Sequence, residues 1–108
     1  MPFKDTTERA LHFAKHGHEF GAADEVAYEQ LADAFMFGDM NGTTQQCART
    51  SGKRDRLRLD FVVVHFGVAG TDSAPEFIRT FYIVRSHLIA SHGGTAGFFA
   101  YECGRVNL

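Results

Sequence analysis

The spacing of apolar residues changes once along this chain, and that change limits which folds are open to it. Up to about residue 38 apolar residues recur every three or four positions, which is the period of an α-helix. From about residue 45 they alternate with polar residues, which is the period of a β-strand. The loops between the strands are too short for crossover helices, so the strands must be antiparallel. The sequence therefore predicts an α+β fold with two N-terminal helices on one face of a four-stranded antiparallel sheet.

The two helices have recognisable ends. The first is predicted over residues 6–16, with Asp5 as its N-cap and Gly17 as its stop. The second is predicted to begin after Asp24, another N-cap residue, and to end at Gly38. Its apolar residues form one stripe that would face the sheet.

The strands are predicted from alternation and from the turn residues between them. The expected strands are residues 45–50, a β-rich run over 57–66 that is either one bent strand or two short ones, 77–85, and 98–103. Residues 70–75 are a predicted turn, and the glycine-rich residues 91–97 a predicted loop. Because the two helices cover one face, the other face is expected to stay partly open.

Composition indicates one globular unit. The chain has 108 residues, of which 44% are hydrophobic, and we expect a single domain over 1–108. No apolar run approaches the ~20 residues of a membrane helix, and the first residues contain no apolar signal region. The two cysteines, Cys47 and Cys103, do not form a CxxC pair and are predicted to be free thiols in a reducing compartment.

Charge is unevenly distributed along the chain. The net charge is -2, but residues 1–42 hold eight acidic and three basic residues, and residues 43–108 hold eight basic and five acidic ones. Five basic residues fall within positions 49–58. This cluster is interpreted either as a local phosphate-binding surface or as a solvated loop and strand edge.

Three histidines, His12, His16 and His18, lie within seven positions, and Glu19 follows His16 by three. His12 and His16 share one helix face. Two histidines at this spacing can bind zinc, but no HExxH motif or nearby cysteine pair completes a metal site. Two other interpretations stay open. The histidines are ordinary surface residues, or they carry acid–base chemistry, because imidazole exchanges a proton near neutral pH.

Three segments resemble one family. Residues 12–21, HFAKHGHEFG, resemble the H-F-x-K-H-G-x-E-F segment of polymorphic bacterial toxins of the barnase–EndoU–colicin–RelE (BECR) superfamily. The second helix, with YEQLADAF at 28–35, is similar to the helix that follows in those toxins. Residues 78–82, IRTFY, are similar to their I-x-T-x-Y/F strand motif. The resemblance spans roughly positions 10–85.

The resemblance implies a metal-independent endoribonuclease without a cofactor, often acting on tRNA, that leaves a 2',3'-cyclic phosphate. The residue matching the catalytic histidine is His16, with His12 second, and Glu19 matches a carboxylate. Thr80 and Tyr82 match the strand pair, and the period of a strand independently places both on one sheet face. The resemblance also implies a cognate immunity protein and action in the cytoplasm, either as a domain delivered by a larger secreted toxin or as a standalone relative, and the lack of a long apolar run predicts no membrane partner.

The residue that balances the phosphate charge is left open among Arg49, Lys53 and Arg58. Arg79 is a weaker candidate because strand alternation points it away from Thr80. Two other functions remain: a non-catalytic module that holds a protein or nucleic acid on the open sheet face, and a zinc site at the paired histidines of the first helix.

Overall fold

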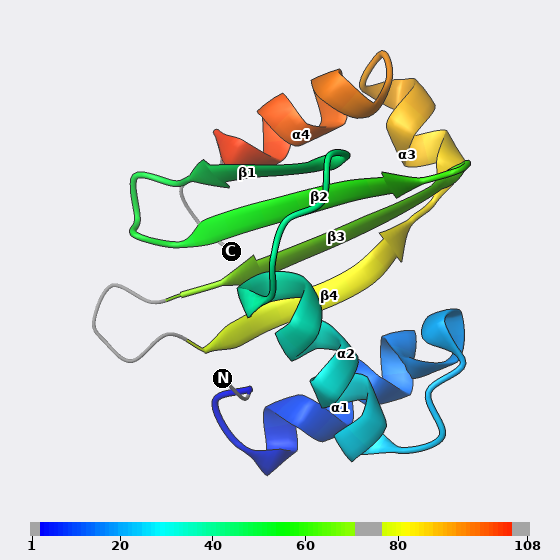
Figure 1. Cartoon of the computed structure of the whole chain (residues 1–108), viewed down its shortest axis with the longest axis vertical. Helices are drawn as coiled ribbons and strands as arrows, with labels where there is room; N and C mark the ends of the chain where they lie inside the picture. The colour runs from blue at the N-terminus through cyan, green and yellow to red at the C-terminus, as the bar shows by residue number, and fades with distance from the viewer. Residues whose placement is uncertain (1–2, 71–76, 105–108) are drawn as a thin grey trace.

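One antiparallel sheet with helices on both sides makes up the fold, in a computed structural model that describes residues 3–70 and 77–104 (Figure 1). Its strands are β1 (Thr44–Ala48), β2 (Arg54–Asp60), β3 (Val63–Ala69) and β4 (Ile78–Val84). They lie in the sheet in sequence order, each antiparallel to its neighbours. The predicted α+β class and four-stranded antiparallel sheet are confirmed. The predicted turn at 70–75 falls almost wholly outside the described residues.

The two N-terminal helices are present as predicted. They are α1 (Thr6–His16) and α2 (Glu25–Phe37), joined in part by a short 3-10 helix, η1 (Gly17–Phe20). The side chains of Asp5 and Asp24 accept hydrogen bonds from the backbone N–H groups of Glu8 and Ala27, both at 2.8 Å. Both predicted N-caps are therefore confirmed, because capping is a local property of a few neighbouring residues.

Helix α1 ends before Gly17 as predicted, but Gly17 does not adopt the left-handed conformation expected of a helix stop. Gly17 keeps a right-handed φ of -56°, and the chain runs on into η1 instead of turning away. The left-handed residue is Gly21, with a φ of 65°, which ends η1. The turn therefore lies four residues later, which keeps His16 and Glu19 in one continuous coil.

Helices α1 and α2 pack on one face of the sheet through an aromatic core. Tyr28 of α2 is fully buried there, and its hydroxyl donates a hydrogen bond to the backbone oxygen of Phe81. Gly67 of β3 allows α2 to approach closely, since a Cβ there would lie 2.6 Å from Met36 Sδ. The buried members of this cluster are Phe3, Tyr28, Ala32, Phe35, Met36, Ala69, Ile78 and Phe81.

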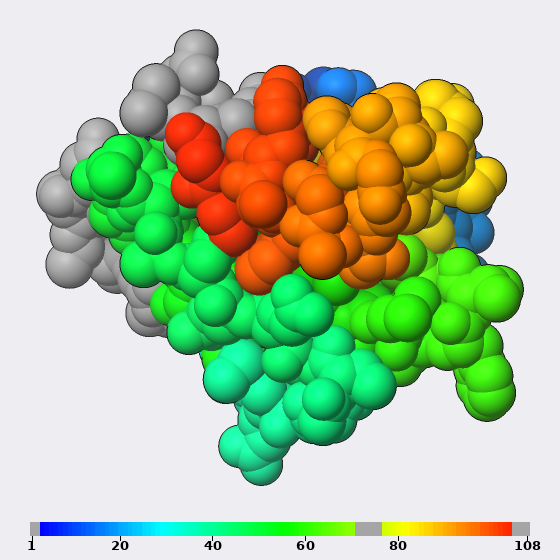
Figure 2. Space-filling view, turned by 90° about the horizontal axis from the view of Figure 1, so that it is seen from above, coloured from blue at the N-terminus to red at the C-terminus, as the bar shows by residue number. Residues whose placement is uncertain are grey.

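The opposite face is covered by two helices that the sequence did not predict, α3 (Ser86–Ser91) and α4 (Thr95–Cys103), which lie across it in Figure 2. The predicted strand at 98–103 and the predicted loop over 91–97 are therefore wrong. Residues 98–103, FFAYEC, lack polar–apolar alternation, and Phe98, Phe99 and Glu102 are buried at helical spacing. The β-rich run over 57–66 is two strands, β2 and β3, so the sheet still has four strands.

The expected open sheet face is largely covered by α4, and it stays open only beside β4, where Thr80 and Tyr82 are half-buried and line a pocket. Phe98 and Phe99 of α4 pack against the side chains that this face presents. The buried members of this second cluster are Leu57, Val64, Phe66, Val68, Val84, Phe98 and Phe99. A binding module on this face would therefore be confined to the part beside β4.

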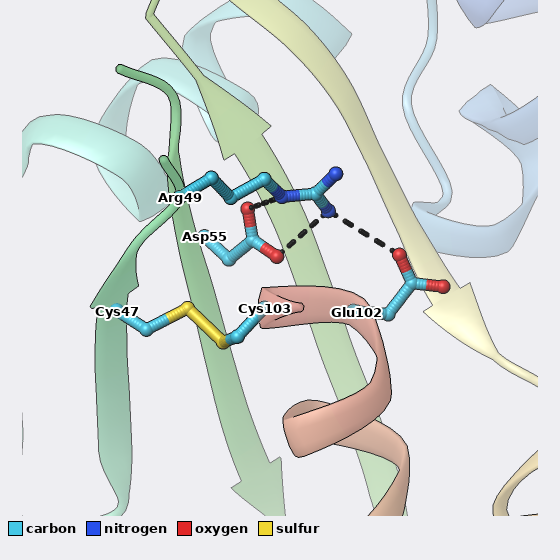
Figure 3. Close-up of a disulfide and its surroundings, with 5 residues drawn as sticks. All are labelled: Cys47, Arg49, Asp55, Glu102 and Cys103. Carbon is cyan, nitrogen blue, oxygen red and sulfur yellow. Dashed lines mark hydrogen bonds and ion pairs between the residues drawn. A yellow bond between two sulfur atoms is a disulfide. The ribbon is translucent and has the colours of Figure 1, made fainter. Parts of the chain in front are cut away.

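A disulfide joins Cys47 of β1 to Cys103 at the end of α4 (Figure 3), so the predicted free thiols are wrong. The guanidinium of Arg49 lies beside it and donates to both carboxylate oxygens of Asp55, at 2.7 and 2.8 Å. It also contacts Glu102 of α4 at 3.3 Å. The disulfide and this buried ion cluster together hold α4 against the sheet.

Removing the disulfide should therefore destabilise the fold. The two cysteines are 56 residues apart, and a cross-link that closes a loop of this length is expected to contribute about 4 kcal/mol to the free energy of unfolding. We expect the double variant Cys47→Ser and Cys103→Ser to unfold at a lower urea concentration than the oxidised wild type. Dithiothreitol should lower the wild-type midpoint and leave that of the double variant unchanged. Equal midpoints for oxidised wild type and variant would contradict this role.

Candidate active site

The outer edge of β4 is where the N-terminal segment meets the sheet. β4 pairs with β3 on one side only, so it is an edge strand and not a central one. Its start is bridged by Phe3, which forms a parallel β-bridge with Ile78. Near its end, the backbone N–H of Ile83 donates to Glu19 Oε1 at 2.8 Å. These two attachments hold α1 along the strand edge.

The second oxygen of Glu19 orients a histidine. Glu19 Oε2 lies 2.8 Å from His16 Nδ1. An ionised carboxylate only accepts hydrogen bonds, so Nδ1 carries a proton and donates it to Glu19, which leaves Nε2 as the nitrogen that can exchange a proton. The His16 ring also stacks against the Tyr82 ring, with centroids 5.3 Å apart and planes 28° apart. One carboxylate thus fixes both the tautomer and the position of this imidazole.

A pocket of about 440 Å³ lies between α1, β4 and α4. The N-terminal segment and α1 contribute Lys4, Glu8 and His12, and α4 contributes Glu102. The sheet contributes Phe66, Ile78, Arg79, Thr80 and Tyr82. The pocket therefore combines an imidazole, two hydroxyls, two cationic side chains and two carboxylates with apolar walls.

His12 is the histidine that lines the pocket directly. Its ring stacks on Phe3 with centroids 5.2 Å apart, and its Nε2 lies 3.7 Å from Glu8 Oε2. Burial lowers the pKa of His12 below its ordinary value of 6.5. The Glu8 carboxylate opposes this shift, and the charges of His16 and Lys15 add to it. His12 is therefore a neutral imidazole at neutral pH, able to accept a proton.

The structure brings the five predicted catalytic residues together. His12, Thr80 and Tyr82 line the pocket, and His16 and Glu19 lie behind Tyr82. His12 and His16 have ring centroids 6.4 Å apart. Residues 64 positions apart in the chain thus share one site, through the Glu19–Ile83 hydrogen bond.

The three predicted phosphate-binding residues lie elsewhere. The Arg49 side chain is 1% exposed and is committed to its bidentate ion pair with Asp55. Lys53 is buried in the turn between β1 and β2. Arg58 lies on the α2 side of the sheet, where its Nε donates to Asp60 Oδ2 at 2.9 Å. None of the three is among the residues that line the pocket.

The neighbouring basic residues serve the fold. Arg56 donates to the backbone oxygens of Phe35 and Gly38, at 3.1 and 2.7 Å, and Arg54 donates to that of Met36 at 3.0 Å. The last carbonyls of a helix lack intrahelical partners and carry partial negative charge. This part of the basic cluster therefore caps the C-terminus of α2.

Two cations at the pocket, Lys4 and Arg79, were missed or discounted from sequence. A β-bulge interrupts the pairing of β3 and β4: Val68 pairs with Thr80 and Ala69 with Ile78, so Arg79 is the extra residue. Simple alternation fails there, and Ile78 joins the α2-side core instead of sharing the face of Thr80 and Tyr82. Lys4 reaches the pocket because the preceding Phe3 pairs with β4, which no local pattern indicates.

The described residues do not add a third ligand to the His12–His16 pair. Within residues 3–70 and 77–104, the one group of three with ligand atoms close enough to share a metal ion is Cys47, Asp55 and Cys103. Its two sulfur atoms are bonded to each other in the disulfide. The zinc interpretation of the paired histidines therefore gains no support from this geometry.

Comparison with family models, curated proteins and solved structures finds no match to this chain. No helix in its described segments is long and apolar enough to cross a membrane. The chemistry of the pocket is therefore the main guide to function, together with the motif resemblance.

The lowered pKa of His12 can be measured directly. We expect its imidazole protons to titrate with a midpoint below 6.5 by NMR, and the midpoint to fall further in Glu8→Gln, because Glu8 stabilises the imidazolium. The unfolded chain in urea, where burial is lost, is the reference. The folded form binds fewer protons than the unfolded form just below pH 6.5, so its free energy of unfolding decreases on acidification through that range. A midpoint at or above 6.5 would contradict the assignment.

Proposed function

We propose that this chain is a metal-independent endoribonuclease that cleaves RNA, with tRNA as the first substrate to test. The observation that supports it best is the meeting of His12 with Thr80 and Tyr82 around one pocket, with the His16–Glu19 pair packed against Tyr82. Paired acid–base groups beside hydrogen-bond donors are what phosphodiester cleavage by an internal hydroxyl requires. A cognate immunity protein and action in the cytoplasm are parts of the same proposal.

The proposed reaction uses the substrate's own 2'-hydroxyl as nucleophile. A base removes the proton of the 2'-OH, and the oxygen forms a new bond to phosphorus. The bond from phosphorus to the 5' oxygen breaks, and an acid supplies the proton that this leaving oxygen needs. The products are a 2',3'-cyclic phosphate and a 5'-hydroxyl, so no water, metal or cofactor enters the balance.

The side chains divide these tasks by their surroundings. His12 is the base, because burial keeps its ring neutral. We assign the acid to His16, which Glu19 holds at 2.8 Å and whose ring lies 5.3 Å from the ring of Tyr82 at the pocket wall. Thr80 and Tyr82 supply hydroxyl donors to the phosphate oxygens, and Lys4 and Arg79 balance the charge that develops there.

Loss of either histidine should abolish most activity. We expect His12→Ala and His16→Ala each to lower kcat by about 10²- to 10⁴-fold, the usual contribution of a placed acid or base. The assay is cleavage of total tRNA in EDTA, with the product ends identified as cyclic phosphates. His18→Ala is the matched control, because His18 is exposed in η1 and lies outside the pocket. Undiminished cleavage by both histidine variants would reject the mechanism.

The contributions of the two pocket cations, Lys4 and Arg79, to RNA binding can be compared with that of Arg58, which the sequence predicted. We expect Lys4→Ala combined with Arg79→Ala to raise KM for tRNA by about tenfold, because both line the pocket and neither forms an ion pair within the described residues. Arg58→Ala should have a smaller effect, since its guanidinium is already paired with Asp60. If Arg58→Ala raised KM more than the double variant, Arg58 of β2 would be the residue that contacts the phosphate.

A further inference from the structure

The turn between β2 and β3 projects two apolar side chains into solvent. Asp60 and Val63 are the last paired residues of the two strands, so Phe61 and Val62 alone form the turn. Phe61 is 99% exposed and Val62 is 91% exposed. The turn lies at the end of the sheet where β4 meets α3 (Figure 1), and light green atoms of this segment protrude at the right of Figure 2.

Phe61 is also conformationally unfavourable. Its φ is 57°, and it is the only described residue other than glycine with a positive φ. A two-residue hairpin turn with a positive φ at its first central position strongly favours glycine, because a Cβ there clashes with the backbone. Phe61 therefore adds strain without adding buried contacts. Neither folding nor stability explains why a phenylalanine occupies this position.

The base of the turn is held firmly. Asp60 Oδ2 accepts a hydrogen bond from Arg58 Nε at 2.9 Å, and His65 Nδ1 lies 3.2 Å from the same oxygen. Arg58 and His65 are paired across β2 and β3. These contacts fix the backbone from which the Phe61 side chain projects.

We propose that Phe61 stacks on an unpaired base of the RNA substrate, outside the nucleotides that enter the pocket. This inference rests on the proposed ribonuclease function. A single ring with both faces open suits a nucleobase, and such stacking tolerates any base sequence. Two side chains cannot bury the ~1,200 Å² that a stable protein interface needs, so a second copy of the chain or a folded protein partner fits less well.

The charges around the turn agree with a phosphate backbone. Arg58 and Asp60, which is the only acidic residue over positions 58–65, pair with each other at the base of the turn, so their charges cancel. Val84 pairs with Val64, and Val63 next to it closes the turn. Arg85 follows Val84, so it lies beside the turn, and it is exposed. The local balance is basic, although the whole chain is acidic.

The distance to the pocket suits one RNA strand. Tyr82 of the pocket pairs with Phe66, which lies three residues along β3 from Val63 at the base of the turn. At the rise of a strand this separation is ~10 Å, and the two turn residues lie beyond it. A few nucleotides of single-stranded RNA span it, whereas a dinucleotide held in the pocket cannot.

The variant Phe61→Gly separates this role from a structural one. Glycine relieves the positive φ, so the variant should unfold at the same or a higher temperature than wild type. Its kcat/KM on tRNA or a long single-stranded oligonucleotide should fall by about tenfold, and cleavage of a dinucleoside monophosphate should not change. Phe61→Trp, which keeps a stacking ring, should retain activity on the long substrates.

Three other outcomes are informative. Equal cleavage of long RNA by wild type and Phe61→Gly would show that the ring does not bind RNA and would leave a protein as its occupant. An equal loss on the dinucleoside would place the defect in the pocket. If wild type cleaves no RNA, the proposed function fails, and fluorescence anisotropy with a single-stranded oligonucleotide tests the turn alone: weaker binding by Phe61→Gly supports stacking, and equal binding rejects it.

Discussion

One carboxylate joins the leading helix to the sheet, and the candidate site depends on it. Glu19 accepts from the edge N–H of Ile83 with one oxygen and contacts His16 Nδ1 with the other. An edge strand offers unpaired N–H groups, and a side chain that accepts from one of them both satisfies it and blocks pairing with another chain. This contact acts together with the Phe3–Ile78 bridge and the His16–Tyr82 stacking to place the histidines of α1 beside Thr80 and Tyr82.

The opposite side of the same pocket is positioned by a different kind of constraint. Glu102 reaches the pocket from α4, and α4 is held by the disulfide and by contact with Arg49. A buried arginine between two carboxylates is costly unless its geometry is good, and the bidentate pair with Asp55 meets that condition. The pocket is thus enclosed by hydrogen bonds at the strand edge and by covalent and ionic links behind it.

Features set by near neighbours were predictable from the sequence, and features set by distant contacts were not. The N-caps Asp5 and Asp24 and the shared face of Thr80 and Tyr82 depend on a few adjacent residues. The disulfide joins residues 56 apart, and α4 was mistaken for a strand because its aromatic residues favour β structure in the absence of clear periodicity.

The candidate site shows the same division. The proposed catalytic residues were named from the motif and from strand periodicity, but the cations that line the same pocket were not. Arg79 was discounted because a bulge is invisible to alternation, and Lys4 was overlooked because its position depends on a bridge to β4. The conspicuous basic cluster was misleading, since its charge is used inside the protein.

The arginines that cap α2 have a consequence for how this protein meets a polyanion. Proteins that neutralise many phosphates release many condensed counterions, and this release drives tight, sequence-independent association. Arg54 and Arg56 are engaged with helix carbonyls, so they have little capacity left for that exchange. Under the proposed function, affinity for RNA would therefore come from the few groups that line the pocket and not from a broad basic surface.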